Sequence, residues 1–164
     1  MRSVVTIKSG SFNLTESKPY FINEACFGDD LARWLIGRFR ERGVETDQEP
    51  GQEDFGWYFG FRLGEESYRA VIGNVAQERW FIVVERACGL LAAILGQQHR
   101  KISLESVLLV HEILGNAPAI DISEVAWFDW TEFRKGTLAA GSPSFVSMVT
   151  HENKKSEKNK IDVW

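Results

Sequence analysis

Residues 50–87 read PGQEDFGWYFGFRLGEESYRAVIGNVAQERWFIVVERA, and this stretch decides the fold of the chain. Near its start, large apolar side chains occupy every second position, at Trp57, Phe59, Phe61 and Leu63. The residues between them are Tyr, Gly and Arg. An apolar period of two is typical of a strand with one buried face, because successive side chains of a strand point to opposite sides. The first run therefore predicts a half-buried β-strand.

Two more strands are predicted in the same stretch. Residues 64–67 make a polar, glycine-containing connection of hairpin length, after which apolar residues alternate again from Tyr68 to Ile72. A second turn-like gap at residues 74–78 leads to residues 79–84, a nearly continuous run of aromatic and β-branched side chains. Such a run suits a strand that is covered on both faces. We therefore expect the third strand to be central in the sheet.

The flanking segments predict further strands. Residues 4–8 are rich in β-branched side chains and predict a strand, which we place at an edge of the sheet. Residues 44–47 predict a short strand that leads into a polar surface loop at residues 48–54. Residues 124–130 predict the last strand of the main sheet, and residues 144–149 are a weaker candidate.

Two long helices are predicted. The first begins at Asp29 or Asp30, whose carboxylates can accept hydrogen bonds from the unpaired amides of a first turn. Apolar residues then recur at helical spacing as far as Phe39, and Gly43 is placed to end the helix. The second helix begins near Ser103. Its expected apolar stripe consists of Leu104, Val107, Leu108, His111 and Leu114.

The order of these elements indicates an α+β fold. We expect a mostly antiparallel sheet of about five to six strands with two main helices packed on one face. Residues 1–130 are expected to form a single α+β domain, because no repeat or low-complexity linker divides them. Residues 131–164 are expected to be a partly disordered carboxyl-terminal extension, since residues 151–160 are poor in apolar side chains. Residues 89–95 suit either a buried turn or a short helix.

Length and composition narrow the class of protein. The chain has 164 residues, of which 44% are hydrophobic, and this suits a domain that needs no disulfide. Its two cysteines, Cys26 and Cys88, form no CxxC pair. We find neither an apolar run near the roughly 18 to 20 residues of a membrane span nor a signal peptide, so we expect a cytoplasmic protein without a membrane partner. The net charge of −4 argues against a nucleic-acid partner.

The best candidate for a chemical site is the pair Glu53 and Asp54, beside an aromatic strand. If Asp29 or Asp30 met this pair, the carboxylates could hold a divalent cation in a metal-assisted hydrolase. Adjacent strand residues point to opposite faces, however, and a solvated loop explains the pair more simply. His111 lacks the second histidine, four residues on, that a zinc-protease helix requires. No nucleotide-binding loop or nucleophile elbow occurs, so we assign no metal, no cofactor and no catalytic residue.

Basic residues raise the question of an anion site. Arginines gather on the first helix, and Arg100 and Lys101 follow later in the chain. Together they could bind an anionic ligand, although a solvated helix face is the commoner reason for such a run. The helix arginines are Arg33, Arg38, Arg40 and Arg42.

One motif resembles a group of known proteins. The sequence PGQEDFGWYF, residues 50–59, follows a helix that ends in Glu-Arg-Gly-Val at residues 41–44. In this it resembles a group of small, uncharacterised bacterial proteins that have no assigned activity. The resemblance covers about residues 21–130 and implies a bacterial protein, but it carries no functional residue. The part after Thr131 departs from the group and reads as an individual extension.

The aromatic residues favour a binding function. They make up 12% of the chain and include six tryptophans, more than a core of this size usually needs. We therefore predict a cytosolic, non-catalytic module that binds a protein or a small ligand through the sheet face left open by the helices. One such case is an immunity-type protein that blocks a basic toxin. The alternatives are the hydrolase described above and a structural subunit that self-associates. The candidate binding residues are Glu53, Asp54, Trp57, Tyr58, Tyr68 and Trp130.

Overall fold

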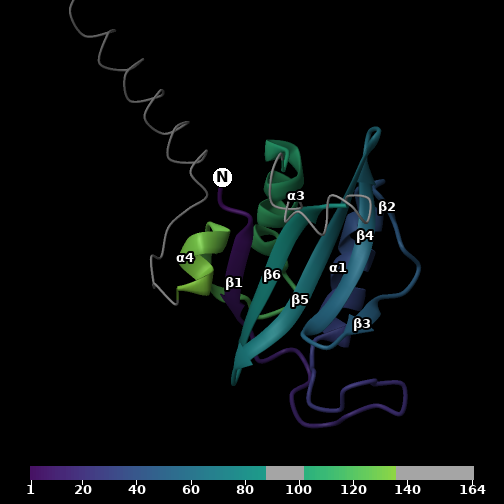
Figure 1. Cartoon of the computed structure of the whole chain (residues 1–164), viewed down its shortest axis with the longest axis vertical. Helices are drawn as coiled ribbons and strands as arrows, with labels where there is room; N and C mark the ends of the chain where they lie inside the picture. Colours follow the sequence, from purple (N-terminus) through teal and green to yellow (C-terminus); the bar gives the residue numbers. More distant parts are fainter. Residues whose placement is uncertain (88–101, 136–164) are drawn as a thin grey trace, which may run out of the picture.

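The strands form one antiparallel sheet of seven strands (Figure 1). The computed structural model describes residues 1–87 and 102–135. Strands are paired in the order β2-β4-β5-β6-β1-β7, and β3 also pairs with β4. The strands are β1 Val4–Lys8, β2 Glu45–Thr46, β3 Gly51–Glu53, β4 Gly56–Leu63, β5 Glu66–Ala76, β6 Arg79–Arg86 and β7 Ser123–Phe128, and the helices are α1 Asp29–Glu41, α3 Leu104–Gly115 and α4 Trp130–Arg134. The predicted α+β class is confirmed.

Residues 50–87 form the expected three-stranded meander, β4-β5-β6. The first turn contains Gly64, whose φ of 58° lies in the left-handed region that favours glycine. Strand β6 is central, between β5 and β1, and its residues 82–84 are buried, as predicted. Strand β1 was expected at an edge, and this was wrong because β7 returns from much later in the chain to pair with its outer side. The local pattern of residues 4–8 carries no information about that partner.

The core lies on one face of the sheet, where α1 and α3 cover it (Figure 1). Alternate residues of β4 point to this face, as their period of two predicts. Phe39 of α1 packs on Phe59 and Phe61 with ring-centroid distances of 5.4 and 4.8 Å. The expected arrangement of two main helices on one face is confirmed.

The first helix begins at Asp29, as the sequence predicts, but its N-cap is Gly28, which has no side chain to cap it, and the two aspartates lie in the first turn. Asp30 accepts a hydrogen bond from the amide of Leu31 in the first turn, at 2.9 Å. Its second oxygen accepts from the amide of Asn13, at 2.7 Å, and Asp29 accepts from the hydroxyl of Tyr20, also at 2.7 Å. The two carboxylates therefore fasten the preceding loop to the helix.

The end of α1 follows the sequence signal. Gly43 has a φ of 74° and donates from its amide to the carbonyl of Arg40, at 2.9 Å. The next amide, of Val44, donates to the carbonyl of Phe39, at 3.1 Å. This pair of bonds is a Schellman motif, which requires the left-handed conformation that glycine adopts without strain.

The buried face of α3 differs from the predicted stripe. Val107 and Leu114 are buried as expected, but Leu104 is 41% exposed. Val110 and Ile113, which the prediction left out, are buried in the core instead. The helix is apolar over most of its circumference, so its sequence does not define which side faces the sheet.

The last predicted strand ends early, at Phe128, because Asp129 starts a helix. The Asp129 carboxylate accepts from the amide of Glu132, at 2.8 Å, and the Glu132 carboxylate accepts from the amide of Asp129, at 3.0 Å. This reciprocal capping box makes Trp130 the first residue of α4 instead of a strand residue. Helix α4 lies on the sheet face opposite α1 and α3, where Phe133 packs against Phe81 at 5.7 Å.

Residues 9–28 form a long connection between β1 and α1, and two core tryptophans hold it in place. The indole N–H of Trp57 donates to the carbonyl of Cys26, at 2.8 Å. That of Trp80 donates to the carbonyl of Ser9, at 3.0 Å. Both indoles thus satisfy their polar group while the rest of the ring fills the core.

The other sequence predictions have mixed outcomes. Residues 48–54 were expected to be a loop, but they include β3, which pairs with β4. The candidates at residues 89–95, 144–149 and 151–160 lie outside the described residues, and the division after residue 130 stays a prediction. None of the helices in the described part of the chain has the length and apolar character needed to cross a membrane.

Candidate binding site

A straight row of side chains crosses the sheet on the face turned away from α1 and α3. Its members are paired strand to strand from β4 to β7 and are Tyr58, Val71, Val83, Val4 and Phe128. Helix α4 packs over the end of the row at β1 and β7. Among the described helices, none packs over the end at β4 and β5 (Figure 1). We call this side of the sheet the open face.

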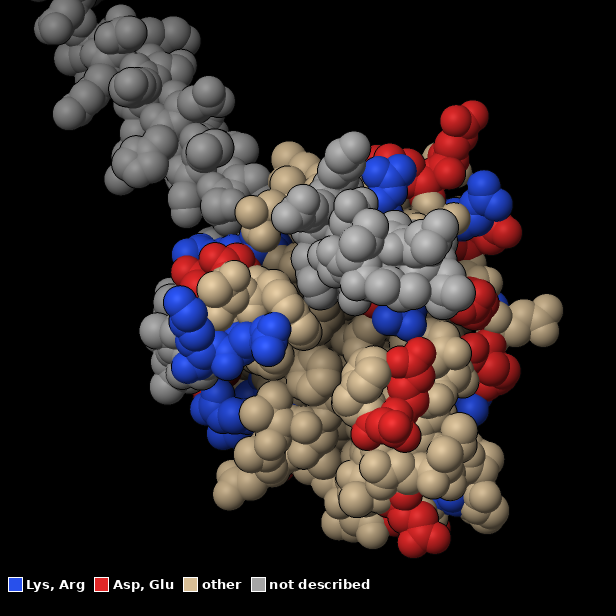
Figure 2. All heavy atoms as spheres, in the orientation of Figure 1, with Lys and Arg blue, Asp and Glu red and all other residues tan. Residues whose placement is uncertain are grey.

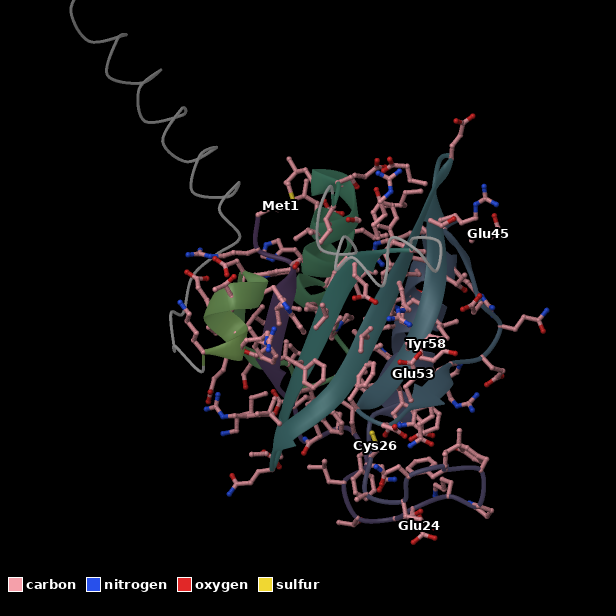
Figure 3. The ribbon with its side chains drawn as sticks, in the orientation of Figure 1. Met1, Glu24, Cys26, Glu45, Glu53 and Tyr58 are labelled. Atoms are coloured by element: carbon pink, nitrogen blue, oxygen red, sulfur yellow. The ribbon has the colours of Figure 1, made fainter. Side chains whose placement is uncertain are left out.

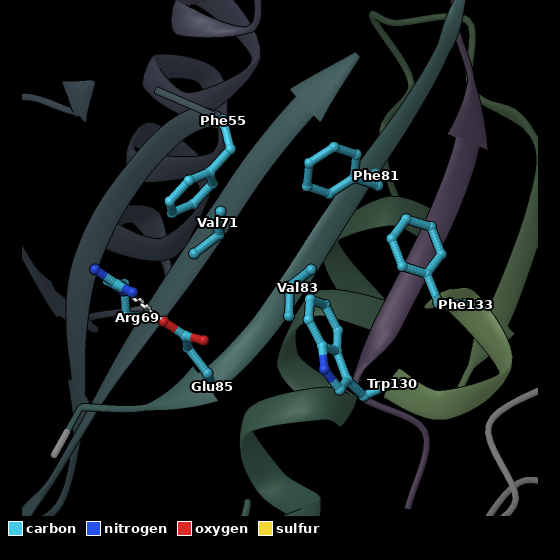
Figure 4. A pocket seen from close by; sticks show the side chains of 8 residues that line it. All are labelled: Phe55, Arg69, Val71, Phe81, Val83, Glu85, Trp130 and Phe133. Atoms are coloured by element: carbon cyan, nitrogen blue, oxygen red, sulfur yellow. Dashed lines mark hydrogen bonds and ion pairs between the residues drawn. The ribbon is translucent and has the colours of Figure 1, made fainter. Parts of the chain in front are cut away.

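A pocket of about 350 Å³ lies on the open face. Val71 and Val83 form its floor, Phe55 stands on the turn before β4 at one side, and Trp130 and Phe133 come from α4 at the other (Figure 4). The other described lining residues are Arg69, Phe81 and Glu85. Figure 2 shows a hollow of uncharged side chains on this face, with acidic and basic groups around it.

Arg69 and Glu85 form the polar corner of the pocket. They are direct partners across β5 and β6, and Nε and Nη2 of Arg69 lie 2.6 and 2.5 Å from Oε1 of Glu85. The Glu85 side chain is only 7% exposed. Nη1 of Arg69 lies 3.2 Å from a carboxylate oxygen of Glu53, and its guanidinium lies over the ring of Tyr58, 5.4 Å from the centroid.

Three of the predicted binding residues lie at this site. Glu53 and Tyr58 both contact Arg69, and Figure 3 shows them together on the β3 and β4 side of the sheet. Trp130 lines the pocket from the opposite side. Asp54 is exposed in the turn next to Phe55. The structure therefore brings together residues that are more than 70 positions apart in the chain.

Two predicted binding residues, Trp57 and Tyr68, lie in the core instead. They are 3% and 1% exposed, on the face that the helices cover. Tyr68 stacks on Phe61, and its hydroxyl donates to the carboxylate of Glu66. Burial, and then this hydrogen bond, raise the pKa of Tyr68. Their places in the strands direct both rings away from the open face, so neither belongs to the pocket.

The carboxylates of the alternative hydrolase do not form a cluster. Asp29 and Asp30 are engaged with the 9–28 loop at the start of α1, whereas Glu53 pairs with Arg69 on the open face. Burial raises the pKa of the Asp30 carboxyl. Across residues 1–87 and 102–135, we find no group of three or more His, Cys, Asp or Glu side chains that could hold a metal ion.

The arginines of α1 are engaged with neighbouring groups. Arg33 pairs with Glu49, Arg38 pairs with Glu41, and Arg40 donates to Thr46 and Asp47. Arg100 and Lys101 lie outside the described residues. These contacts fit the interpretation that the arginines form a solvated helix surface and stabilise the fold through ion pairs and hydrogen bonds to nearby residues.

Sequence reasoning missed most of the pocket residues. The hairpin turn at residues 77–78 pairs Ala76 with Arg79, and by itself this register would place Arg69 opposite Arg86. A register shift between Asn74 and Ala76 moves Arg69 opposite Glu85, so the turn alone did not predict this pair. Phe81 alternates with the core residues of β6 and could have been assigned to the open face in the same way. No sequence signal shows that Phe133 comes back across the sheet, because that depends on where α4 packs.

Comparison with protein-family models, with curated proteins and with solved structures finds no match for this chain. The resemblance to small bacterial proteins therefore stays a prediction. Function has to be inferred from the geometry of the site.

Proposed function

We propose that this chain is a non-catalytic binding module that takes up a small organic ligand in the pocket on the open face. The observation that carries the proposal is a cavity of about 350 Å³ whose described lining residues form aromatic walls and one polar corner. Binding sites for small molecules are typically concave and mostly apolar, with a few polar groups that orient the ligand, and range over about 300–1,000 Å³. The pocket has each of these features.

The walls of the pocket are held in place before any ligand arrives. Its floor belongs to β5 and β6, two central strands of the sheet. On α4, the ring of Trp130 stacks on that of Phe133 at 6.2 Å, and Phe133 in turn packs on Phe81. A preformed site loses little conformational entropy on binding, which leaves more of the interaction free energy for affinity.

The ionisable groups support binding more than catalysis. Among the described lining residues these groups are Arg69 and Glu85, and they are paired with each other. A general acid or base has to exchange a proton with the substrate, and a nucleophile needs a base beside it. A paired arginine and glutamate are better suited to orienting a ligand.

The size of the pocket favours a small molecule over a protein. A standard protein–protein interface buries about 1,600 Å² in total. A cavity of about 350 Å³ holds one small molecule or one side chain of a partner. An immunity-type partner and self-association are therefore weaker forms of the binding hypothesis.

The proposal can be tested by titrating Nile red, a neutral dye that fluoresces in apolar surroundings. Trp130→Ala removes one wall, so we expect it to weaken dye binding on the order of tenfold, which corresponds to about 1.4 kcal/mol. Trp34→Ala is the matched control. Trp34 is a half-buried tryptophan of α1 that packs against Phe12 at 6.1 Å, on the other side of the sheet.

Equal dye binding by wild type and Trp130→Ala would contradict the proposal, as would an equal loss in Trp34→Ala. A pull-down adds a second comparison. If a protein from a native extract binds in a manner that depends on Trp130 and Tyr58, while no small molecule competes, the open face is a protein-docking surface and the small-ligand proposal is wrong.

A further inference from the structure

Building on this proposed function, we infer that the ligand is an organic amine. Its apolar body, aromatic or of similar size, lies on Val71 and Val83 between Phe55 and Trp130. Its protonated amino group donates a hydrogen bond to Oε2 of Glu85. Three features of the pocket support this class of ligand: an unused carboxylate oxygen, the charge of the polar corner, and the aromatic walls.

Glu85 keeps one oxygen available. In the usual two-pronged pairing of arginine with a carboxylate, each oxygen takes one N–H. Here Nε and Nη2 of Arg69 both approach Oε1, and no described residue donates to Oε2. In Figure 4 the free oxygen points away from Arg69, toward the side of Val83 and Trp130. Because the Glu85 side chain is only 7% exposed, its Oε2 has few contacts with water. A hydrogen bond from a ligand N–H would replace the hydration that this charged oxygen has lost.

The polar corner has an excess of negative charge. Arg69 contributes one positive charge, while Glu85 and Glu53, both paired with it, contribute two negative charges. The remaining described lining residues are uncharged. The balance of one negative charge favours a monocation over a neutral molecule and disfavours an anion.

The walls of the pocket suit a cation as well. The pocket is lined by four aromatic side chains, those of Phe55, Phe81, Trp130 and Phe133. The faces of aromatic rings carry partial negative charge and attract a cation within about 6 Å of the ring centre. Arg69 already makes such a contact with Tyr58 at the edge of the site, at 5.4 Å. An alkylamine that carries an aromatic ring therefore matches both the shape and the electrostatics of the pocket.

The test compares three probes of similar shape: 2-phenylethylamine, 2-phenylethanol and 3-phenylpropanoate, whose head groups are cationic, neutral and anionic. Affinities are measured by NMR titration of the ¹⁵N-labelled full chain. We expect the amine to bind on the order of tenfold more tightly than the alcohol, as befits a charged hydrogen bond. The acid should bind most weakly. The shifted amide signals should include those of residues 69 and 85.

Substitution identifies the carboxylate responsible. Glu85→Gln keeps the shape but removes the charge, and it should abolish the preference for the amine. The matched control is Glu66→Gln, since Glu66 also pairs with an arginine, Arg86, at 2.6 Å, but lies beside Tyr68 away from the pocket. Glu66→Gln should keep the preference. If Glu85→Gln does not fold, the order of the three probes on the wild-type chain decides.

The outcomes separate this inference from the proposed function. Equal binding of amine and alcohol, or tighter binding of the acid, overturns the inference, and so does a preference that survives Glu85→Gln. In these cases Nile red binding that depends on Trp130 would still support a small-ligand pocket. Absence of binding by every probe, Nile red included, overturns both.

Discussion

Adjacent residues of β4 and β5 have opposite roles, depending on whether they fall on the covered or the open face. Trp57 fills the core while Tyr58, the next residue, contacts Arg69 on the open face. Tyr68 is buried under the helices, while the next residue, Arg69, forms the polar corner of the pocket. A shift of one residue in strand register would exchange these two sets of side chains.

Two glycines, one in the sheet and one in α1, differ in whether the fold has room for a side chain at their position. A Cβ on Gly56 would overlap the carbonyl oxygen of Ile72 on the neighbouring strand. Gly37, in the middle of α1, has no atom within 4 Å of the position that a Cβ would take. The first glycine is required by a close backbone approach, and the second is not.

These two glycines should respond in opposite directions to alanine. Gly56→Ala is expected to lower the free energy of unfolding by about 1–3 kcal/mol, since the overlapping atom belongs to the backbone and moves only with its strand. Gly37→Ala is expected to raise it by about 0.5–1 kcal/mol, because alanine restricts the unfolded chain and favours the helix. Urea denaturation of both variants measures the two changes. A destabilised Gly37→Ala would contradict this account of α1.

At the scale of elements, α4 is the piece that turns an open sheet face into a pocket. It has only five residues, too few for an isolated helix to be stable in water. Its capping box and the packing of Phe133 on Phe81 and Phe128 hold it in place. Weakening the cap should therefore affect the pocket as well as the stability.

Asp129→Ala tests the role of this cap. Loss of an N-cap side chain typically costs about 1 kcal/mol, and we expect that loss of unfolding free energy together with weaker binding of Nile red. Ser103→Ala removes the corresponding cap of α3, where the hydroxyl accepts from the amide of Ser106 at 3.2 Å. The control should lose similar stability but keep dye binding. Parallel denaturation and dye titration of the two variants would show whether α4 has this specific role.

At the scale of the whole molecule, the two faces of the sheet divide stability from binding. The covered face holds most of the buried apolar side chains, packed under α1 and α3. The open face has a smaller apolar cluster, under α4, and the pocket beside it. Substitutions on the covered face are therefore expected to change the free energy of unfolding, and substitutions at the pocket on the open face are expected to change ligand binding.

Two phenylalanines give a direct comparison. Phe39 of α1 is fully buried, and Phe39→Ala should lower the free energy of unfolding by about 3–5 kcal/mol through lost packing and a cavity. Phe55 is 58% exposed at the mouth of the pocket, and Phe55→Ala should change stability by no more than about 0.5 kcal/mol while weakening dye binding. A large loss of stability in Phe55→Ala, or unchanged binding, would show that the two faces are not separable in this way.

Much of the sheet was predictable because its signals are local. The alternation from Trp57 to Leu63 defined β4 and its buried face, and Gly43 defined the end of α1. Each of these patterns records a property of neighbouring residues: which side of a strand is apolar, or which position needs a left-handed backbone. The α+β class and the two helices on one face followed from them.

The binding site depended on contacts between distant parts of the chain. β1 lies inside the sheet because β7 pairs with it, and Trp130 belongs to a wall because α4 folds back over the open face. The pairing of Arg69 with a single oxygen of Glu85 also appears only in three dimensions. Local periodicity shows that a residue is buried or exposed, whereas the partner it meets is set by the packing of the entire chain, since that packing minimises the free energy of all contacts together.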